Sequence, residues 1–460
     1  MAEPTSLVKV VEVCRVAPPP PPSPGAFASP SSLSLTFFDI RWLRFGPVQR
    51  LFSTKCLLPL QHRSSLIPYL SQNSKPHSLT PSSTFYLSQE TSLGLEDSQK
   101  PVLNYVQGDT VSLTIAESGA DFYHLSSGDF VEATEYHPFV PRLEASHEQA
   151  AVMALQITVF PNCGFSIGTS MHHAVLDGKS STLFVKSWAH ICKHDDDQSN
   201  SVLPDELKQF YDRVIQDPAQ LGKIYSNDYR NKDGPNNRSL MFWEMKPPPD
   251  SIRGIFEFTR ADIETMRQSF KAKMAEQKPV HVSTFTLACA YTWVCVVKAE
   301  DIKADKTRLI FSMDCRSRLD PPIPANYFGN CIAGCIPVAE TKGLLGEDGL
   351  VVAVNAISEA IERLEKGVLD GAENWVSRLF AVRSEGRLLS IAGSNRFGNY
   401  DTDFGWGRPK KFEIVSIDRT RAISLSDSKT GAGAIEVGLV LDKHDMHVFA
   451  SLCAKGLRNL

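Results

Sequence analysis

The sequence predicts an α/β protein with two domains. Strand-like apolar runs alternate with helical patterns along most of the chain, as in folds that mix helices and sheets. Two such runs, at 152–160 and 164–171, are joined by turn-forming residues and followed by a helical pattern at 180–192. The chain has 460 residues, of which 42% are hydrophobic. This length and composition are sufficient for two cores of ordinary size.

The first predicted domain covers residues 1–200. We expect its first strand at 7–16, and we expect the proline-rich segment 17–32 to form an exposed loop, because proline fits neither a helix interior nor a sheet interior. The helix that contains Trp188 should pack behind the sheet. Further strands are expected at 102–106, 110–117, 152–160 and 164–173.

The second predicted domain covers residues 250–460 and follows a crossover linker at 201–249, which shows little periodicity. A strand and an amphipathic helix are expected over 254–274. The apolar run at 283–300 is too short to cross a bilayer and predicts a buried central helix. The remaining elements are an amphipathic helix at 350–366, short strands at 412–417, 422–425 and 435–441, and a closing helix.

Composition argues against several classes of partner. The net charge of -4 gives no reason to expect binding to nucleic acid or to an anionic membrane. The ten cysteines form no regular framework, so we expect reduced thiols in a cytoplasmic protein. Cys331 and Cys335 lack a second pair of ligands, and no metal site is expected. The N-terminal residues do not resemble a secretory signal.

The string HHAVLDG at 172–178 lies where a buried strand ends and a helix begins, a place that can hold a side chain rigidly beside a cavity. His173 can serve as a base near neutral pH, and Asp177 can brace its loop. The simpler interpretation is a strand-end histidine and a helix-capping aspartate. The longer string resembles the HHxxxDG signature of the CoA-dependent acyltransferase superfamily.

Three other strings make this resemblance more specific. LTFFD at 35–39 resembles the opening of the plant BAHD acyltransferases, and YFGNC at 327–331 is similar to a string of their malonyltransferase branch. DFGWG at 403–407 follows in the family's order. The resemblance implies two similar-sized α/β domains, each with a mixed sheet, and a solvent channel between them. A peptide-synthetase condensation domain shares HHxxxDG but not DFGWG.

The resemblance implies direct acyl transfer in a ternary complex, without a covalent acyl-enzyme. His173 would take the proton of an acceptor hydroxyl and return it to the CoA thiolate. Backbone amides or the Trp406 indole would stabilise the oxyanion. Asp177 would hold the loop through an ion pair with an arginine such as Arg316 or Arg318, and His172 would be a packing residue.

The DFGWG residues are expected to form a tight turn, in which glycines adopt positive φ. Asp403 would either stabilise this turn or transfer a proton, and it is the second catalytic candidate. Lys179 and Arg408 are the candidates for binding the free carboxylate of the donor. The structural motif residues are Asp177, Gly178, Phe404, Gly405, Trp406 and Gly407.

The resemblance therefore implies malonyl transfer from malonyl-CoA, as a co-substrate without a further cofactor, to a sugar hydroxyl of a flavonoid or phenolic glucoside. We expect the enzyme to be a cytoplasmic monomer. An acyltransferase that uses an aromatic or acetyl donor is the first alternative. An inactive paralogue is the second, because residues 56–96 are rich in Ser, Pro, Thr and Gln and depart from the family pattern. Spacing is preserved on both sides of this stretch, as a shifted reading frame would produce.

Overall fold

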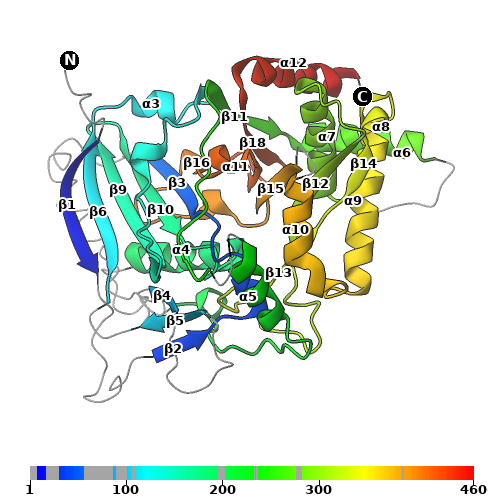
Figure 1. The fold of residues 1–460 in the computed structure, drawn as a ribbon. Coiled ribbons are helices and arrows are strands. Elements are labelled where there is room, and N and C mark those ends of the chain that lie inside the picture. Colours follow the sequence, from blue (N-terminus) through cyan, green and yellow to red (C-terminus); the bar gives the residue numbers. More distant parts are fainter. Residues whose placement is uncertain are drawn as a thin grey trace.

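A computed structural model describes residues 8–16, 31–55, 86–89, 101–105, 109–194, 203–232, 234, 237–275, 282–384 and 388–459. Two large mixed sheets lie side by side (Figure 1). The long helices α7 (Thr284–Ala299), α9 (Gly349–Lys366) and α12 (Lys443–Asn459) gather around the second sheet. Most of the predicted loop at 17–32 and most of the unusual stretch 56–96 lie outside the described residues. Ser31 and Ser32, at the end of that predicted loop, instead begin a strand, β2 (Ser31–Ser34). The α/β class with mixed sheets is confirmed.

The first sheet has six strands in the order β1-β6-β9-β10-β3-β16. β6 and β9 are parallel and the other neighbours are antiparallel. The hairpin β9-β10 turns at Asn162, whose φ is 63°, and every residue of both strands is buried. The predicted hairpin is thereby confirmed. The bounds are β1 Val8–Val16, β3 Val48–Lys55, β6 Val111–Ser118, β9 Met153–Phe160, β10 Gly164–Met171 and β16 Lys411–Ile414.

The second sheet has eight strands in the order β13-β12-β15-β17-β18-β11-β7, with β14 also paired to β12. β15 is parallel to both of its neighbours, and the other pairs are antiparallel. The bounds are β7 Val131–Glu132, β11 Ser251–Phe258, β12 Lys306–Asp314, β13 Ile332–Cys335, β14 Val338–Glu340, β15 Leu388–Ser394, β17 Ile423–Asp427 and β18 Ile435–Asp442.

A smaller antiparallel sheet has the order β2-β5-β4-β8, with bounds Ser31–Ser34, Pro101–Tyr105, Tyr86–Gln89 and Gln149–Ala151 respectively. Its strand β4 belongs to the unusual stretch 56–96, and it pairs on both sides, with β5 and with β8. This part of the stretch is therefore integrated into the fold.

The two large sheets exchange short strands. β16 comes late in the chain and pairs with β3, with Phe412 opposite Phe52. β7 comes early and pairs with β11. A buried ion pair joins the same region, because Arg253 on β11 donates to the Glu413 carboxylate on β16 at 2.9 Å. The division into 1–200, 201–249 and 250–460 stays a prediction, and strand pairing crosses it in both directions.

The longer helices α4, α6, α7, α9 and α12 follow the predicted pattern, whereas α5 and α10 were not predicted. α7 is buried on all sides, as expected of a central helix, and its Trp293 indole donates to Thr307 at 3.1 Å. α5 lies inside the segment predicted to be a linker. The bounds are α1 Phe37–Ile40, α3 Phe122–Leu125, α4 Gly178–Lys193, α5 Leu221–Lys232, α6 Arg260–Lys273, α7 Thr284–Ala299, α8 Thr341–Leu345, α9 Gly349–Lys366, α10 Trp375–Ser384, α11 Ile417–Thr420 and α12 Lys443–Asn459.

α5 was missed because it is mostly polar and buries only a narrow stripe. Leu221, Tyr225 and Tyr229 recur at intervals of four residues and are all buried. Among the described residues, no helix is both long enough and apolar enough to cross a membrane.

A buried glutamate between the sheets gives a testable pH dependence. Burial raises the pKa of Glu436 to about 7, and Tyr400 donates to its carboxylate at 2.7 Å. In the unfolded chain this carboxyl ionises near 4.5, so the free energy of unfolding should fall as pH rises from there to about 7 and then level off. We expect Glu436→Gln to stabilise the protein by up to roughly 3 kcal/mol above that range.

Urea unfolding of Glu436→Gln and the parent at about pH 5 and about pH 8 checks this expectation. The stabilisation should be much larger at the higher pH. An equal difference at both pH values would show that Glu436 does not titrate in this window.

Candidate active site

The HHAVLDG loop is fixed at both of its ends. At the strand end, the backbone N–H of His172 donates to the Val152 carbonyl at 2.8 Å. At the helix end, Asp177 is the N-cap of α4 and accepts from the Ser180 N–H at 2.9 Å. A capping carboxylate is favourable here, because the first N–H groups of a helix have no partner within the helix. The loop therefore has a defined shape on which His173 is carried.

His173 is half-buried and held by its neighbours. The Trp42 indole stacks on its ring, with centroids 3.9 Å apart and an interplanar angle of 5°. The Asn330 amide donates to its backbone carbonyl at 2.8 Å. Burial lowers the pKa of His173 to about 4, although its own backbone and the Asp177 charge act in the opposite direction. The imidazole is therefore neutral at physiological pH, as a general base must be.

His172 has a different environment. Its ring is fully buried beside Phe242, and its Nδ1 accepts from the Ala174 N–H at 3.1 Å. Burial, and to a smaller extent His173, lower its pKa to about 3. These contacts fit a packing role for His172.

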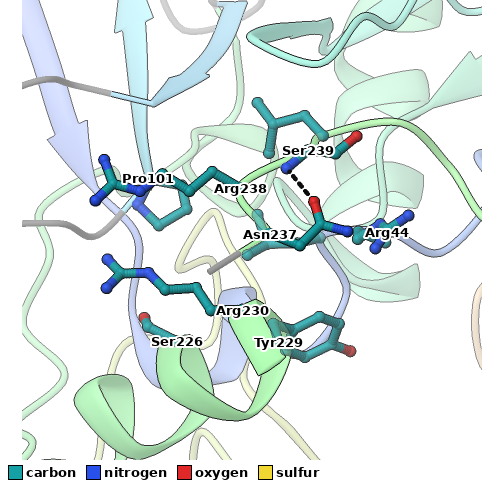
Figure 2. A pocket seen from close by; sticks show the side chains of 10 residues that line it. Arg44, Pro101, Ser226, Tyr229, Arg230, Asn237, Arg238 and Ser239 are labelled. Carbon is teal, nitrogen blue, oxygen red and sulfur yellow. Dashed lines mark hydrogen bonds between the residues drawn. The ribbon is translucent and has the colours of Figure 1, made fainter. Parts of the chain in front are cut away.

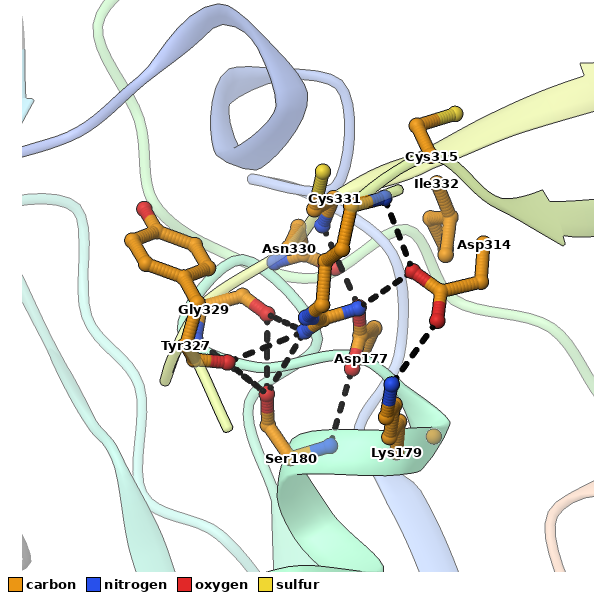
Figure 3. A network of polar contacts seen from close by, with 12 residues as sticks. Asp177, Lys179, Ser180, Asp314, Cys315, Tyr327, Gly329, Asn330, Cys331 and Ile332 are labelled. Carbon is orange, nitrogen blue, oxygen red and sulfur yellow. Dashed lines mark hydrogen bonds and ion pairs between the residues drawn. The ribbon is translucent and has the colours of Figure 1, made fainter. Parts of the chain in front are cut away.

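Asp177 points into a buried polar network (Figure 3). It forms a 2.9 Å ion pair with Arg316, and the two side chains are 1% and 2% exposed. Asp177 also accepts from the Cys331 N–H at 3.1 Å. The prediction that an arginine holds Asp177 is confirmed, and the partner is Arg316. Arg318 instead contacts Glu365.

Two other motif strings meet behind His173. Asn330, in YFGNC, donates from both its backbone and its side chain to the buried carboxylate of Asp39, at 2.9 and 3.0 Å. Asp39, in LTFFD, also accepts from Thr36 at the start of α1. Since Asn330 also binds the His173 carbonyl, these residues form a chain of contacts that supports the loop. Sequence reasoning found both strings but assigned neither residue a role.

The DFGWG residues form the predicted tight turn. Asp403 accepts from the N–H groups of Gly405 and Gly407, both at 2.9 Å, and pairs with Lys193 at 2.8 Å. The two glycines have φ of 97° and 101°, as that turn requires. The geometry fits the stabilising role proposed for Asp403.

The same turn lies far from His173. Lys193 is the last residue of α4, whose 16 residues span about 22 Å, whereas His173 precedes the first turn of this helix. The Trp406 ring packs on Phe165, at the start of β10. His173 follows the other end of this strand, so the length of the strand, about 20 Å, separates it from Phe165. The expectation that the Trp406 indole stabilises the oxyanion is therefore wrong, because Trp406 packs at the opposite end of β10.

Asp403 should consequently matter for stability rather than chemistry. Asp403→Ala removes a carboxylate that accepts two backbone hydrogen bonds and one ion pair, and we expect a loss of about 2 kcal/mol. Below the lowered melting temperature, kcat should stay within a few-fold of the parent. Thermal unfolding and steady-state assays check both expectations, and a folded variant with kcat lowered about a hundredfold or more would favour proton transfer.

The two donor-binding candidates are separated. Lys179 follows the motif glycine at the start of α4 and pairs with Asp314 at 3.0 Å, and both side chains are about 40% exposed. Arg408 is exposed and contacts Asp401 beside the DFGWG turn. A malonyl carboxylate is one methylene away from the reacting carbonyl, so Arg408 lies too far from His173 to bind it.

A basic pocket lies beside α5 (Figure 2). Arg44, Arg230 and Arg238 contribute guanidinium groups to its lining, and Pro101 lies beside the last two. Arg44 donates to the Met241 carbonyl at 3.1 Å. The lining contains no residue of the four motif strings. In the part of the chain that the structure describes, no group of acidic, histidine and cysteine side chains could hold a metal ion.

The chain is similar to known proteins over most of its length. Residues 107–454 match the model of the Transferase family. The chain is 37% identical to phenolic glucoside malonyltransferase 1 of Arabidopsis thaliana, over 99% of this chain and 98% of that one. It is 38% identical to the malonyl-CoA:anthocyanidin 5-O-glucoside-6''-O-malonyltransferase of the same plant, over 98% and 99%.

Relatives with other names also match. Agmatine coumaroyltransferase of Arabidopsis thaliana is 34% identical over 98% of this chain and all of that one. The crystal structure of vinorine synthase superposes with a TM-score of 0.65 at 17% identity, over 96% of both chains, which supports the fold alone. With its motifs in family order and a family match over most of its length, the chain belongs to the Transferase family of BAHD acyltransferases and is an acyltransferase.

Proposed function

We propose that this enzyme transfers a malonyl group from malonyl-CoA to a sugar hydroxyl of a flavonoid or phenolic glucoside, with His173 as the general base. The observation that carries the chemistry is the neutral, half-buried imidazole that stacks on Trp42, on a backbone held by the Asn330 contact. The choice of donor and acceptor is supported by the two malonyltransferase relatives.

Burial of Nδ1 supports one nitrogen of His173 for the proposed reaction. Nδ1 is buried and has no hydrogen-bond partner among the described residues, so Nε2 would face the substrates. Nε2 would take the proton as the acceptor oxygen attacks the thioester carbonyl. When the tetrahedral intermediate collapses, the carbon–sulfur bond breaks and the imidazolium returns the proton to the thiolate. The products are a malonate ester and free CoA thiol.

We also propose how the substrates reach His173 and in which oligomeric state the enzyme acts. The donor and acceptor would enter a channel between the two sheet-containing halves and meet at His173, since binding sites often lie between domains. The enzyme would act as a cytoplasmic monomer. A monomer mass by light scattering under assay conditions would support the last point.

Release of free CoA thiol tests the proposed function. Purified enzyme is mixed with malonyl-, acetyl- or coumaroyl-CoA, with and without a flavonoid glucoside. Acceptor-dependent release with malonyl-CoA as the preferred donor is expected, and mass spectrometry should show a product heavier by one malonyl group. No release with any donor would favour the inactive paralogue.

An aromatic-donor transferase is the second candidate. The match to agmatine coumaroyltransferase supports it, because that relative is similar over the same span. Faster release from coumaroyl-CoA than from malonyl-CoA would establish this alternative.

A further inference from the structure

We propose that Arg41 binds the free carboxylate of the acyl donor and thereby selects malonyl-CoA over uncharged donors. This inference rests on the proposed malonyl transfer and assigns its specificity to a residue outside the HHAVLDG and DFGWG motifs. Three observations support it. Arg41 is buried, it lies near His173, and the other cations around the loop already have partners.

Among the residues that the structure describes, Arg41 is a buried cation without an acidic partner. It follows α1 directly and is 8% exposed. Its Nη1 donates to the Ile332 carbonyl at 3.1 Å, and within the described ranges it forms no other hydrogen bond and no ion pair. Burial lowers its pKa, and the groups that oppose this effect are Tyr225, Tyr229 and Cys315. None of these is a carboxylate, so the charge is not balanced within the described structure.

The guanidinium lies one aromatic ring away from the base. It packs over the Trp375 ring at 4.6 Å and over the Trp42 ring at 5.5 Å. The same Trp42 ring stacks on His173 at 3.9 Å. A donor carbonyl positioned at His173 would therefore place its carboxylate, one methylene away, close to the Arg41 side chain.

The other cations around this loop already have partners. Arg316 pairs with both Asp177 and Asp314. Lys179 pairs with Asp314. Arg50 donates to Thr182 and to the Gly178 carbonyl, and the charge of Asp177 stabilises it.

Arg41 keeps Nε and Nη2 free of hydrogen bonds within the described residues. These two donors form one edge of a planar guanidinium, the arrangement that binds a carboxylate through two parallel hydrogen bonds. The aromatic rings on either side would hold this edge in place and exclude water. The geometry thus suits a carboxylate better than a neutral acyl group.

Donor preference in Arg41→Gln tests the proposal. We compare kcat/KM for malonyl-CoA and acetyl-CoA at a fixed glucoside concentration. The malonyl value should fall by about 10- to 150-fold, the range for hydrogen bonds between charged groups, and the acetyl value should change by less than about twofold. Arg41→Lys keeps the charge but not the planar edge, so it should lose malonyl activity to a smaller extent. Arg267→Gln, on the surface helix α6, is the matched control and should change neither value.

Each outcome has a distinct meaning. If Arg41→Gln retains the malonyl preference, or if both donors lose activity equally in a variant that melts cooperatively, the assignment of Arg41 is overturned. If Arg41→Gln does not fold, Arg41→Lys provides the same comparison of donors. If the parent enzyme itself prefers acetyl- or coumaroyl-CoA, the proposed malonyl transfer fails as well, which separates the two proposals.

Discussion

His173→Ala should lower acceptor-dependent release of CoA thiol by about 10²- to 10⁴-fold, the usual contribution of a general base. The physical reason is that the substitution removes the imidazole that is proposed to take the proton of the acceptor hydroxyl. Binding of malonyl-CoA should persist, because the substitution removes a proton acceptor and leaves Arg41 in place. Steady-state kinetics and donor binding by calorimetry check the two parts.

The pH profile of the parent enzyme gives an independent check. Because the pKa of His173 is lowered to about 4, the base should stay neutral, and kcat/KM should stay level, as pH falls from about 8 to about 5. Activity should decline only as pH falls through the lowered pKa. His444→Ala, at an exposed histidine of α12, is the matched control and should leave the rate unchanged. An acid limb near the ordinary histidine pKa would contradict the assignment of His173 as the base.

Asp177→Ala should have the largest effect on stability. The substitution removes the N-cap of α4 and leaves the buried Arg316 guanidinium with Asp314 as its remaining carboxylate. Removing one partner of a buried ion pair costs about 3–5 kcal/mol. Because the same loop carries His173, kcat should also fall in the fraction that remains folded. Urea unfolding and steady-state assays measure the two effects.

Asp314→Ala is the matched control for Asp177→Ala. It removes the other carboxylate that contacts Arg316, but the Asp314 side chain is 39% exposed. Water can replace much of that contact, so its cost should be well below that of Asp177→Ala. Equal losses in the two variants would show that burial does not govern this network.

Sequence periodicity predicted the elements whose hydrophobic pattern is strong. Strands β9 and β10 and helices α4, α7 and α9 agree with it within a few residues. α5 was missed because its buried stripe is narrow and the rest of the helix is polar. The sequence predicted β16 as part of a longer strand. It did not predict that β16 pairs with β3, because strand order depends on contacts between distant segments.

At the candidate site, too, the sequence predicted local structure but not contacts between distant segments. HHAVLDG located the candidate base because a short string can specify a strand-end loop and its cap. The strings also suggested that Trp406 and Arg408 act near His173, whereas the structure places both beside the DFGWG turn, at the other end of β10 and α4. Conversely, Trp42 and Asn330 are remote from His173 in sequence but contact it in space, and Arg41 packs on Trp42. Such contacts require the tertiary fold.

The exchange of β16 and β7 between the large sheets has a consequence for biosynthesis. During translation, β3 has no partner on its outer edge until residues 411–414 leave the ribosome. An open edge with unpaired N–H and carbonyl groups is a site for aggregation. A fragment that ends before β11 would keep this edge permanently and would also lose the partner of β7. We therefore expect the two halves to mature together, and we expect separately expressed halves to be insoluble.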